Sequence, residues 1–202
     1  MRSLVANVEV LDELPLIEKQ PDMKMVGLIS DTHIPSRSQE LPAGVFEVVR
    51  DADLIIHAGD LTDLHVVEEL EKIAPVLAVH GNMDGDEVRA RLPEFNSTNV
   101  YGWRIGVMHD PGALWGMSVM RRIAKERRLR VLVFGHTHRQ FMKWEDDVLF
   151  INPGSATNPL PPIIVKPTVG LLLATEKSVR PLIVKMWSLK DPRLQSPLSI
   201  VA

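Results

Sequence analysis

Short apolar runs that each end at a histidine or an aspartate constrain the fold of this chain more than any other feature. In one of them, residues 131–134 lead directly into Gly135, His136, Thr137 and His138. A β-branched apolar run that stops at glycine is typical of a buried strand. In extended backbone, His136 and His138 are expected to project to one side with Cα atoms ~6–7 Å apart. Two imidazoles in this arrangement can bind one metal ion or a close pair of ions.

The other histidines follow the same rule. Six of the seven fall at or just past the end of an apolar run: His33, His57, His80, His109, His136 and His138. Open sheets place their ligand sites at the carboxyl ends of strands, so these side chains can meet at one edge. Each motif alone has an ordinary explanation, because Gly59-Asp60 and Gly81-Asn82 are also common turn pairs. The ordered set, rather than any single member, indicates a metal centre.

Composition excludes several classes of function. The chain has no cysteine, which excludes disulfides, thiolate nucleophiles and sulfur ligands and leaves imidazole, carboxylate and amide groups to bind metal. A net charge of -3 argues against a partner bound mainly through the phosphate backbone of nucleic acid. No apolar run approaches the ~20 residues of a membrane span, and Pro15 and acidic residues interrupt any signal-like segment. We therefore expect a cytoplasmic protein with no membrane partner.

The 202 residues are expected to form one domain between two ends of different character. Residues 1–24 are predicted to be an N-terminal extension. Because Met23 and Met25 directly precede the first strong strand pattern, one hypothesis is that translation begins there. Detection of an intact residue-1 terminus by mass spectrometry would contradict it. Residues 25–187 are predicted to be the domain, and residues 188–202 a loose tail. Strands alternate with helices early in the domain and hairpins dominate later, so an α+β fold of two packed sheets flanked by helices accounts for both parts.

Local patterns add three expectations. Thr62 is predicted to cap a helix, and a hairpin is predicted to turn about Asp146-Asp147. Residues 115–128 are predicted to form another helix. Basic residues on and just after it are Arg121, Arg122, Lys125, Arg127, Arg128 and Arg130. We expect a solvated face or a contact within a homo-oligomer there, with nucleic-acid contact as the weaker alternative.

The motifs taken together resemble a known family. The series Asp31-x-His33, Gly59-Asp60, Gly81-Asn82, His109 and Gly135-His136-x-His138 is similar to that of the calcineurin-like metallophosphoesterases. The Asn82-Met83-Asp84 variant and the Asn152-Pro153-Gly154-Ser155 turn are most similar to the small bacterial and archaeal phosphodiesterase branch. The resemblance covers about residues 25–187 and implies a four-layer α/β/β/α sandwich. It also implies a small phosphoester substrate, a phosphodiester first and a phosphomonoester second.

The resemblance assigns the ligands residue by residue. Asp31, His33 and His138 would hold one divalent ion, Asn82, His109 and His136 the other, and Asp60 would bridge them. Manganese is the first candidate for both ions, with nickel, cobalt, iron, zinc or magnesium as alternatives. Two cations ~3.5–4 Å apart need an anionic bridge, and a hydroxide shared between them would attack phosphorus. Asp60, Asn82 and His109 are accordingly the predicted catalytic residues, because the amide of Asn82 can also donate to the phosphoryl group.

Two positions depart from the family pattern. Many relatives have a histidine where this chain has Met83, and that histidine can protonate the leaving oxygen. Relatives in the small branch often follow the ligand at position 109 with Gly-His, whereas this chain has Asp110-Pro111. A general acid and a substrate-contacting histidine are therefore missing from their usual places. Residues predicted to orient ligands or to bind phosphate, with ordinary surface or packing roles as the alternative, are Arg37, His57, Asp84 and Asn152.

Three other functions compete with hydrolysis of small phosphoesters. The small subunit of the eukaryotic retromer coat has this fold without a full ligand set, so a non-catalytic protein-binding scaffold is the main alternative. DNA-repair relatives make a nuclease the second, although they carry insertions for which this chain has no room. A metallo-β-lactamase-like hydrolase also uses His-x-His but continues to Asp-His, whereas Arg139-Gln140 stands here. The complete set of seven predicted ligands favours the enzyme.

Overall fold

Two β-sheets form the centre of the molecule. The computed structural model describes residues 10–11, 17–112, 116–157 and 166–186. In spatial order the first sheet contains β1 (Val10–Leu11), β11 (Val179–Lys185), β10 (Thr168–Ala174), β2 (Lys24–Ile29), β3 (Leu54–Ala58) and β4 (Val76–Val79). The second contains β5 (Phe95–Val100), β6 (Trp103–Met108), β7 (Val131–Val133), β9 (Val148–Asn152) and β8 (Phe141–Glu145). The helices of the described ranges are α1 (Ala43–Val49), α2 (His65–Glu71), α3 (Asp86–Arg91) and α4 (Met117–Glu126).

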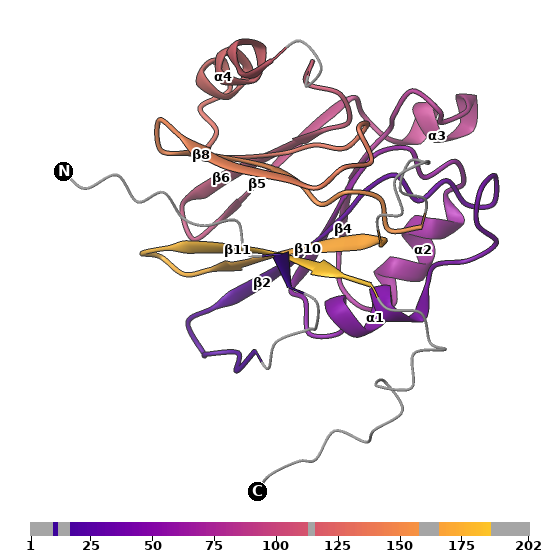
Figure 1. Ribbon diagram of the computed structural model, residues 1–202, viewed down its shortest axis with the longest axis horizontal. Helices are drawn as coiled ribbons and strands as arrows, with labels where there is room; N and C mark the ends of the chain where they lie inside the picture. Colours follow the sequence, from indigo (N-terminus) through magenta and orange to yellow (C-terminus); the bar gives the residue numbers. More distant parts are fainter. Residues whose placement is uncertain (1–9, 12–16, 113–115, 158–165, 187–202) are drawn as a thin grey trace, which may run out of the picture.

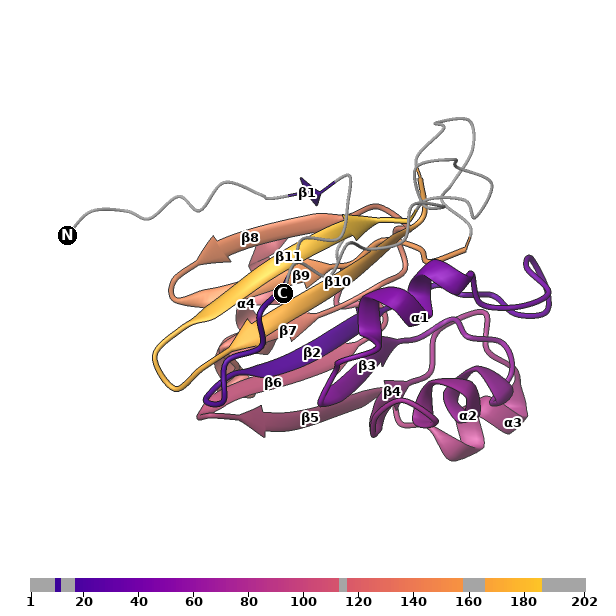
Figure 2. The same cartoon turned by 90° about the horizontal axis from the view of Figure 1, so that it is seen from below.

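The two sheets stack face to face, and helices cover their outer faces (Figures 1 and 2). One apolar core joins α1 and α2 to the first sheet, a second lies between the sheets, and a third lies between α4 and the second sheet. Both sheets are mixed, with parallel and antiparallel pairs. The predicted four-layer α/β/β/α sandwich is therefore confirmed.

Alternate side chains of β2 belong to different cores, as the period of two in a strand requires. Met25 and Ile29 pack toward the helices, whereas Val26 and Leu28 pack toward the second sheet. Because both faces of this sheet are covered, the strand is apolar from Met25 to Ile29 rather than alternating. The same burial on two faces explains why the polar residues of the site appear only after the strand ends.

Parallel strands bring the ends of both sheets together. β2, β3 and β4 are parallel neighbours, and so are β6, β7 and β9. Parallel neighbours end at the same edge of a sheet, so the loops after them can share one site. The two edges meet where the backbone N–H of His136, after β7, donates to Asp31 Oδ1, after β2, at 3.1 Å.

Two hairpins of the second sheet turn on residues with positive φ. The β5–β6 hairpin turns at Tyr101 (φ 50°) and Gly102 (φ 83°). The β8–β9 hairpin turns at Asp146 (φ 49°) and Asp147 (φ 59°). Two-residue turns of this kind match the right-handed twist of the strands they join. The hairpin predicted about Asp146-Asp147 is confirmed.

The structure corrects two details of the predicted helices. α2 begins at His65 with Leu64 as its N-cap and no side-chain cap, so the prediction for Thr62 is wrong. The backbone N–H of Thr62 instead donates to Asp84 Oδ1 at 2.6 Å, which draws this residue toward the loop after β4. The helix predicted over residues 115–128 is α4, which ends at Glu126, so half of the basic residues lie beyond it.

The two ends of the chain are described only in part. β1 lies within the predicted N-terminal extension and pairs in parallel with β11, Val10 opposite Ile183. The predicted tail, residues 188–202, lies outside the described residues, and so does more than half of residues 1–24. Among the helices that the structure describes, none is long and apolar enough to cross a bilayer.

Candidate metal centre

Three predicted ligands form a buried group that we call the inner half-site. Asp31 and His33 follow β2, and His138 follows β7. The Nε2 atoms of His33 and His138 lie 3.0 Å apart, and His138 Nε2 lies 3.3 Å from Asp31 Oδ1. All three residues are buried, with at most 6% of their surface exposed. The prediction that they lie together is therefore met by the geometry.

Asp60, after β3, lies beside this group and reaches beyond it. Its Oδ2 is 3.7 Å from His33 Nε2 and 3.3 Å from His109 Nε2. One ligand atom from each of Asp31, His33, Asp60 and His138 falls within 4.8 Å of the others. This separation suits a single coordination sphere, and the contact with His109 places Asp60 between the inner half-site and a further predicted ligand. The bridging role of Asp60 stays a prediction.

The remaining three predicted ligands meet around the amide of Asn82, and we call this group the outer half-site. Asn82 Oδ1 lies 3.1 Å from His109 Nε2 and 2.9 Å from His136 Nδ1. His109 Nδ1 donates to Ala58 O at 2.8 Å, so in the neutral ring the lone pair lies on Nε2, where a metal would bind. His109 is buried, but the side chain of His136 is 27% exposed and Asn82 is exposed. The outer half-site is thus the more open of the two.

Most of the ligands sit on left-handed backbone. The residues with positive φ are Asp31 (52°), His33 (47°), Asp60 (56°), His136 (68°) and His138 (55°). Such conformations cost of order 1–3 kcal/mol each for residues other than glycine and persist where surrounding contacts hold them. The expectation of extended backbone at His136 and His138 is therefore wrong. The ring of His138 contacts His33 in the inner half-site, whereas the ring of His136 contacts Asn82 in the outer one.

Two glycines allow the ligand loops to approach one another. A Cβ on Gly135 would collide with Ser30 Oγ and come within 2.8 Å of Asp31 Oδ2. A Cβ on Gly81 would collide with Asp60 Oδ1. The glycines that precede Asn82 and His136 in the motifs are thus required by the packing of the site, and not only by turns.

Burial and charge set the protonation of the centre. Burial lowers the pKa of His33 to about 4, so its ring is neutral at pH 7 and can offer a lone pair. Burial also raises the pKa of Asp31, against the charges of His109 and His138. At Asp60 burial acts in the same direction, but the hydrogen bond and charge of His109 prevail and lower the pKa. Two buried carboxylates thus depend on nearby positive charge, which metal ions would supply.

Asp84 joins two ligand loops instead of capping α3. Its carboxylate accepts backbone N–H bonds from Asp60 at 3.0 Å, from Thr62 at 2.6 Å and from Gly81 at 2.7 Å. The N-cap of α3 is Gly85, and no side chain caps that helix. A buried carboxylate with three such bonds ties the loop after β3 to the loop after β4.

His57 and Arg37 stand in different relations to the ligands. His57 is fully buried, and its Nε2 lies 3.1 Å from Thr32 Oγ1, on the residue between two inner ligands. Arg37 is exposed, and its backbone N–H donates to His33 O at 2.7 Å. The roles predicted for both, in orienting a ligand and in binding phosphate, stay predictions.

Other polar residues support the loops, and sequence reasoning found only one of them. Asn152 donates to Gly135 O at 2.6 Å and so holds the loop before His136, in keeping with its predicted place. Ser155, which the sequence marks only as the last residue of the same Asn-Pro-Gly-Ser turn, donates to Asp31 O at 2.7 Å. The side chain of Arg89 donates to backbone carbonyls of the loop that carries Asn82. The sequence did not indicate this support, because nothing near Arg89 distinguishes it from the other arginine of the same short helix.

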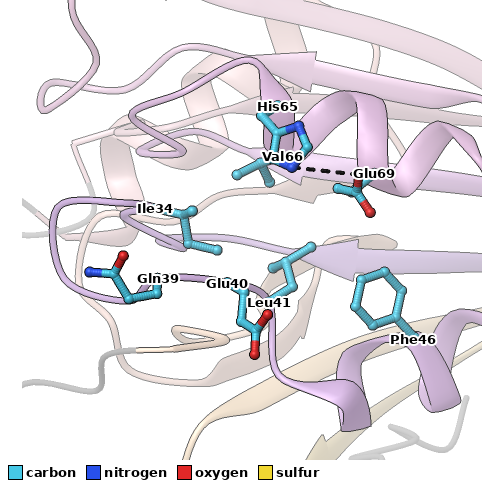
Figure 3. A pocket seen from close by; sticks show the side chains of 8 residues that line it. All are labelled: Ile34, Gln39, Glu40, Leu41, Phe46, His65, Val66 and Glu69. Carbon is cyan, nitrogen blue, oxygen red and sulfur yellow. Dashed lines mark ion pairs between the residues drawn. The ribbon is translucent and has the colours of Figure 1, made fainter.

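A cleft of about 230 Å³ opens beside the outer half-site. Its lining includes Asn82, His109 and His136 together with His80, Arg89 and Asp110. Figure 3 shows a second cavity, of about 240 Å³, where Ile34 and Phe46 lie near the ion pair of His65 with Glu69. That cavity contains none of the predicted ligands. The first cleft, by contrast, borders three predicted ligands and offers space for a substrate beside them.

The side chains of the two half-sites fit divalent metal ions. Together with Asp60 they offer four imidazole rings, two carboxylates and one amide oxygen. Imidazole and carboxylate ligands suit manganese, iron, cobalt, nickel and zinc. The nitrogens of His33 and His138 and the buried carboxyl group of Asp31 converge on one place, where a cation would stabilise the carboxylate.

Comparison with known proteins defines the class. Residues 23–176 match the calcineurin-like phosphoesterase superfamily domain, so the chain belongs to this superfamily and the resemblance is confirmed. A probable metallophosphoesterase from Methanothermobacter thermautotrophicus is 44% identical over 140 residues, which cover 67% of this chain and 78% of that protein. A phosphodiesterase of Methanocaldococcus jannaschii is 30% identical over 172 residues, which cover 79% of this chain and 99% of that protein.

A solved structure shows the same architecture. Vacuolar protein sorting 29 from Cryptosporidium parvum matches with a TM-score of 0.73 over 82% of this chain and 92% of that chain. At 23% sequence identity this likeness shows the fold alone. The family and the buried Asp/His cluster together place the chain among the metallophosphoesterases.

Proposed function

We propose that this chain hydrolyses phosphoester bonds, phosphodiesters first and phosphomonoesters second, with one divalent ion in each half-site. The strongest support is Asp60, whose Oδ2 lies within 3.7 Å of a ring nitrogen of each half-site. The names of the curated relatives, a probable metallophosphoesterase and a phosphodiesterase, support the same chemistry. Manganese is the first candidate metal, and nickel, cobalt, iron, zinc and magnesium suit the same ligands.

Each of three residues of the centre has a separate role in the proposed reaction. Asp60 sets the distance between the half-sites and offsets the repulsion of two cations. The bond from His109 Nδ1 to Ala58 O keeps Nε2 in the metal-binding tautomer. Asn82 can offer its amide oxygen to a metal and its N–H₂ group to a phosphoryl oxygen. When bound, the two ions would lower the pKa of an attacking water and stabilise charge on the phosphoryl oxygens.

The cleft beside the outer half-site supports a small substrate with a good leaving group. Its volume of about 230 Å³ is below the ~300–1,000 Å³ of sites that enclose a drug-sized ligand. Met83, next to Asn82, is 52% exposed and has no proton to donate. Without an acid at that position, we expect esters of acidic alcohols and phenols to react much faster than alkyl esters.

Metal content and turnover, measured on the same samples, test the proposal. Full-length protein is stripped with a chelator, reloaded with one divalent ion at a time, and assayed with a p-nitrophenyl phosphodiester, p-nitrophenyl phosphate, an alkyl diester and an oligonucleotide. We expect metal-dependent turnover that is fastest with the p-nitrophenyl diester. Protein that binds no metal and is inert would instead support the protein-binding scaffold, and preferred cleavage of the oligonucleotide would support a nuclease.

A further inference from the structure

Arg89, in α3, holds the loop that carries Asn82 by three hydrogen bonds. Its Nε donates to Asp84 O at 2.7 Å, and its Nη2 donates to Gly81 O and Asn82 O, both at 3.0 Å. A guanidinium is planar and carries five donors in a fixed arrangement. Three bonds to a stretch of four residues therefore fix the path of its backbone. We call residues 81–84 the Asn82 loop.

The position of the Asn82 amide depends on that backbone. Asn82 is exposed, so packing does little to restrict its side chain. Its Oδ1 nevertheless lies 3.1 Å and 2.9 Å from ring nitrogens of the two other outer ligands. Within the loop, the backbone N–H of Gly81 donates to the carboxylate of Asp84, and the carbonyl of Gly81 accepts from Arg89. These bonds to backbone N–H and C=O groups hold the loop, and the held backbone keeps Asn82 Oδ1 near the two rings.

We infer that Arg89 is a positioning residue for the outer metal ion: it holds the Asn82 loop where the amide oxygen meets His109 and His136. The inference rests on the proposed function, because it requires an ion in the outer half-site. Removal of an outer-sphere partner of this kind commonly weakens metal binding by about 10–100-fold. Arg89 lies outside the motifs that relate the chain to its family.

The inner half-site provides an internal reference. Asp31, His33 and His138 lie on the loops after β2 and β7. In the part of the chain that the structure describes, the hydrogen bonds of the Arg89 side chain go to the Asn82 loop alone. Loss of Arg89 should therefore weaken one ion and leave the other unchanged, a pattern that general destabilisation would not produce.

Calorimetric titration of metal-free, full-length protein with Mn²⁺ tests this directly. Wild type should bind two ions per chain. Arg89→Met keeps the length of the side chain and removes its donors, so one ion should bind as in wild type and the other about 10–100-fold more weakly. Electron paramagnetic resonance at intermediate Mn²⁺ should then change from a coupled pair to an isolated ion. Neither readout depends on activity.

Matched variants separate geometry from charge and from folding. Arg91→Met removes an exposed arginine of the same helix and should bind both ions as wild type does. Arg89→Lys keeps the charge but cannot make three bonds to the loop, so it should resemble Arg89→Met. In an Asn82→Ala background, Arg89→Met should add little further loss, because both changes act on the same ligand.

Each outcome decides for or against the positioning role. Unchanged affinity for both ions, equal weakening of both, full rescue by lysine, or additive losses in the double variant would each overturn it. Thermal unfolding of the metal-free proteins identifies a misfolded Arg89→Met, in which case the same titration of Arg89→Lys decides. Wild-type protein that binds no ion would overturn the proposed function itself, which no result with the variants alone can do.

Discussion

The inner and outer half-sites use similar ligands in different surroundings. Asp31 and His33 are 0% and 1% exposed, whereas the side chain of His136 is 27% exposed and Asn82 is exposed. The buried set includes a carboxylate whose pKa burial raises, so it gains most from a cation that stays in place. The open set borders the cleft of about 230 Å³. An ion in the inner half-site would therefore be buried and would stabilise the fold, whereas an ion in the outer half-site would face the substrate.

The supports of the two half-sites differ in the same way. The inner loops are held by buried groups, such as Ser155, whose hydroxyl donates to Asp31 O at 2.7 Å. The Asn82 loop is held by the exposed Arg89 at its surface and by the buried Asp84 beneath it. Substitutions should therefore affect folding when they fall in the inner half-site and mainly metal affinity when they fall in the outer one.

Asp60 lies beside both half-sites, so its substitution should affect metal binding at both of them equally. Asp60→Asn removes the anionic bridge while keeping the shape, and we expect both ions to be lost and turnover to fall to background. Metal analysis and the p-nitrophenyl diester assay check this. Asp63→Asn, at an exposed position three residues later, should behave as wild type. Full metal occupancy with wild-type turnover in Asp60→Asn would refute the bridging assignment.

His138 and His136 lie two residues apart and allow the sharpest comparison of the half-sites. His138→Ala should remove the inner ion and lower the free energy of unfolding of the metal-free protein by about 2–3 kcal/mol, because a buried polar cluster is broken. His136→Ala should remove the outer ion but change that free energy by no more than about 0.5 kcal/mol. Urea unfolding and metal analysis measure both. Equal loss of stability in the two variants would contradict the contrast.

Asp84 ties the loop of Asp60, which borders both half-sites, to the Asn82 loop, so its loss should affect both half-sites at a smaller scale. Asp84→Asn weakens three bonds to backbone N–H groups and should cost about 1–2 kcal/mol of unfolding free energy. Both ions should bind more weakly as well. Asp86→Asn, on the exposed first turn of α3, is the matched control and should be nearly neutral. An Asp84→Asn protein as stable as that control would show that the three bonds are unimportant.

The last expected effect is a pH dependence of the metal-free protein. Burial lowers the pKa of His57 to about 3 and of His33 to about 4, whereas an unfolded histidine titrates near ~6.5. Below that pH the unfolded chain binds protons that the folded chain does not, so stability is present above pH ~6.5 and is lost as the pH falls. His57→Gln should remove its share, and the slope should fall by up to about 1.4 kcal/mol per pH unit.

Urea unfolding of chelator-treated protein between pH 7.5 and pH 5 measures this slope. His65→Gln changes a histidine whose side chain is 61% exposed, so its slope should match that of wild type. If wild type and His57→Gln lose stability in parallel as the pH falls, the buried neutral state of His57 does not contribute to the acid sensitivity.

The strands, and the edge at which the candidate ligands gather, could be predicted because local sequence carries them. β2 and β7 are apolar runs that stop where glycine, aspartate and histidine begin, and parallel pairing sends those ends to one edge. The backbone at His136 could not be predicted in this way. Its positive φ is held by contacts such as the bond from its N–H to Asp31 Oδ1, between residues 105 positions apart.

The loop supports escaped prediction for the same physical reason. The three donors to Asp84 come from two loops, and one of them is the backbone N–H of Thr62. The hydroxyl of Thr62 donates to Ile34 O at 2.6 Å, and α2 begins only at His65, so Thr62 does not cap that helix. Within the described residues, the side chain of Arg89 donates to backbone carbonyls alone, and a carbonyl carries no sequence signature. Residue types pointed to the candidate ligands, but only the folded backbone reveals what positions them.

Anomalous diffraction from crystals of the full-length protein soaked in Mn²⁺ tests the central claim most directly. The account predicts two peaks ~3.5–4 Å apart, with the carboxylate of Asp60 between them. One should lie among Asp31, His33 and His138, and the other among Asn82, His109 and His136. A single peak at saturating Mn²⁺, or two peaks that do not share Asp60, would contradict it.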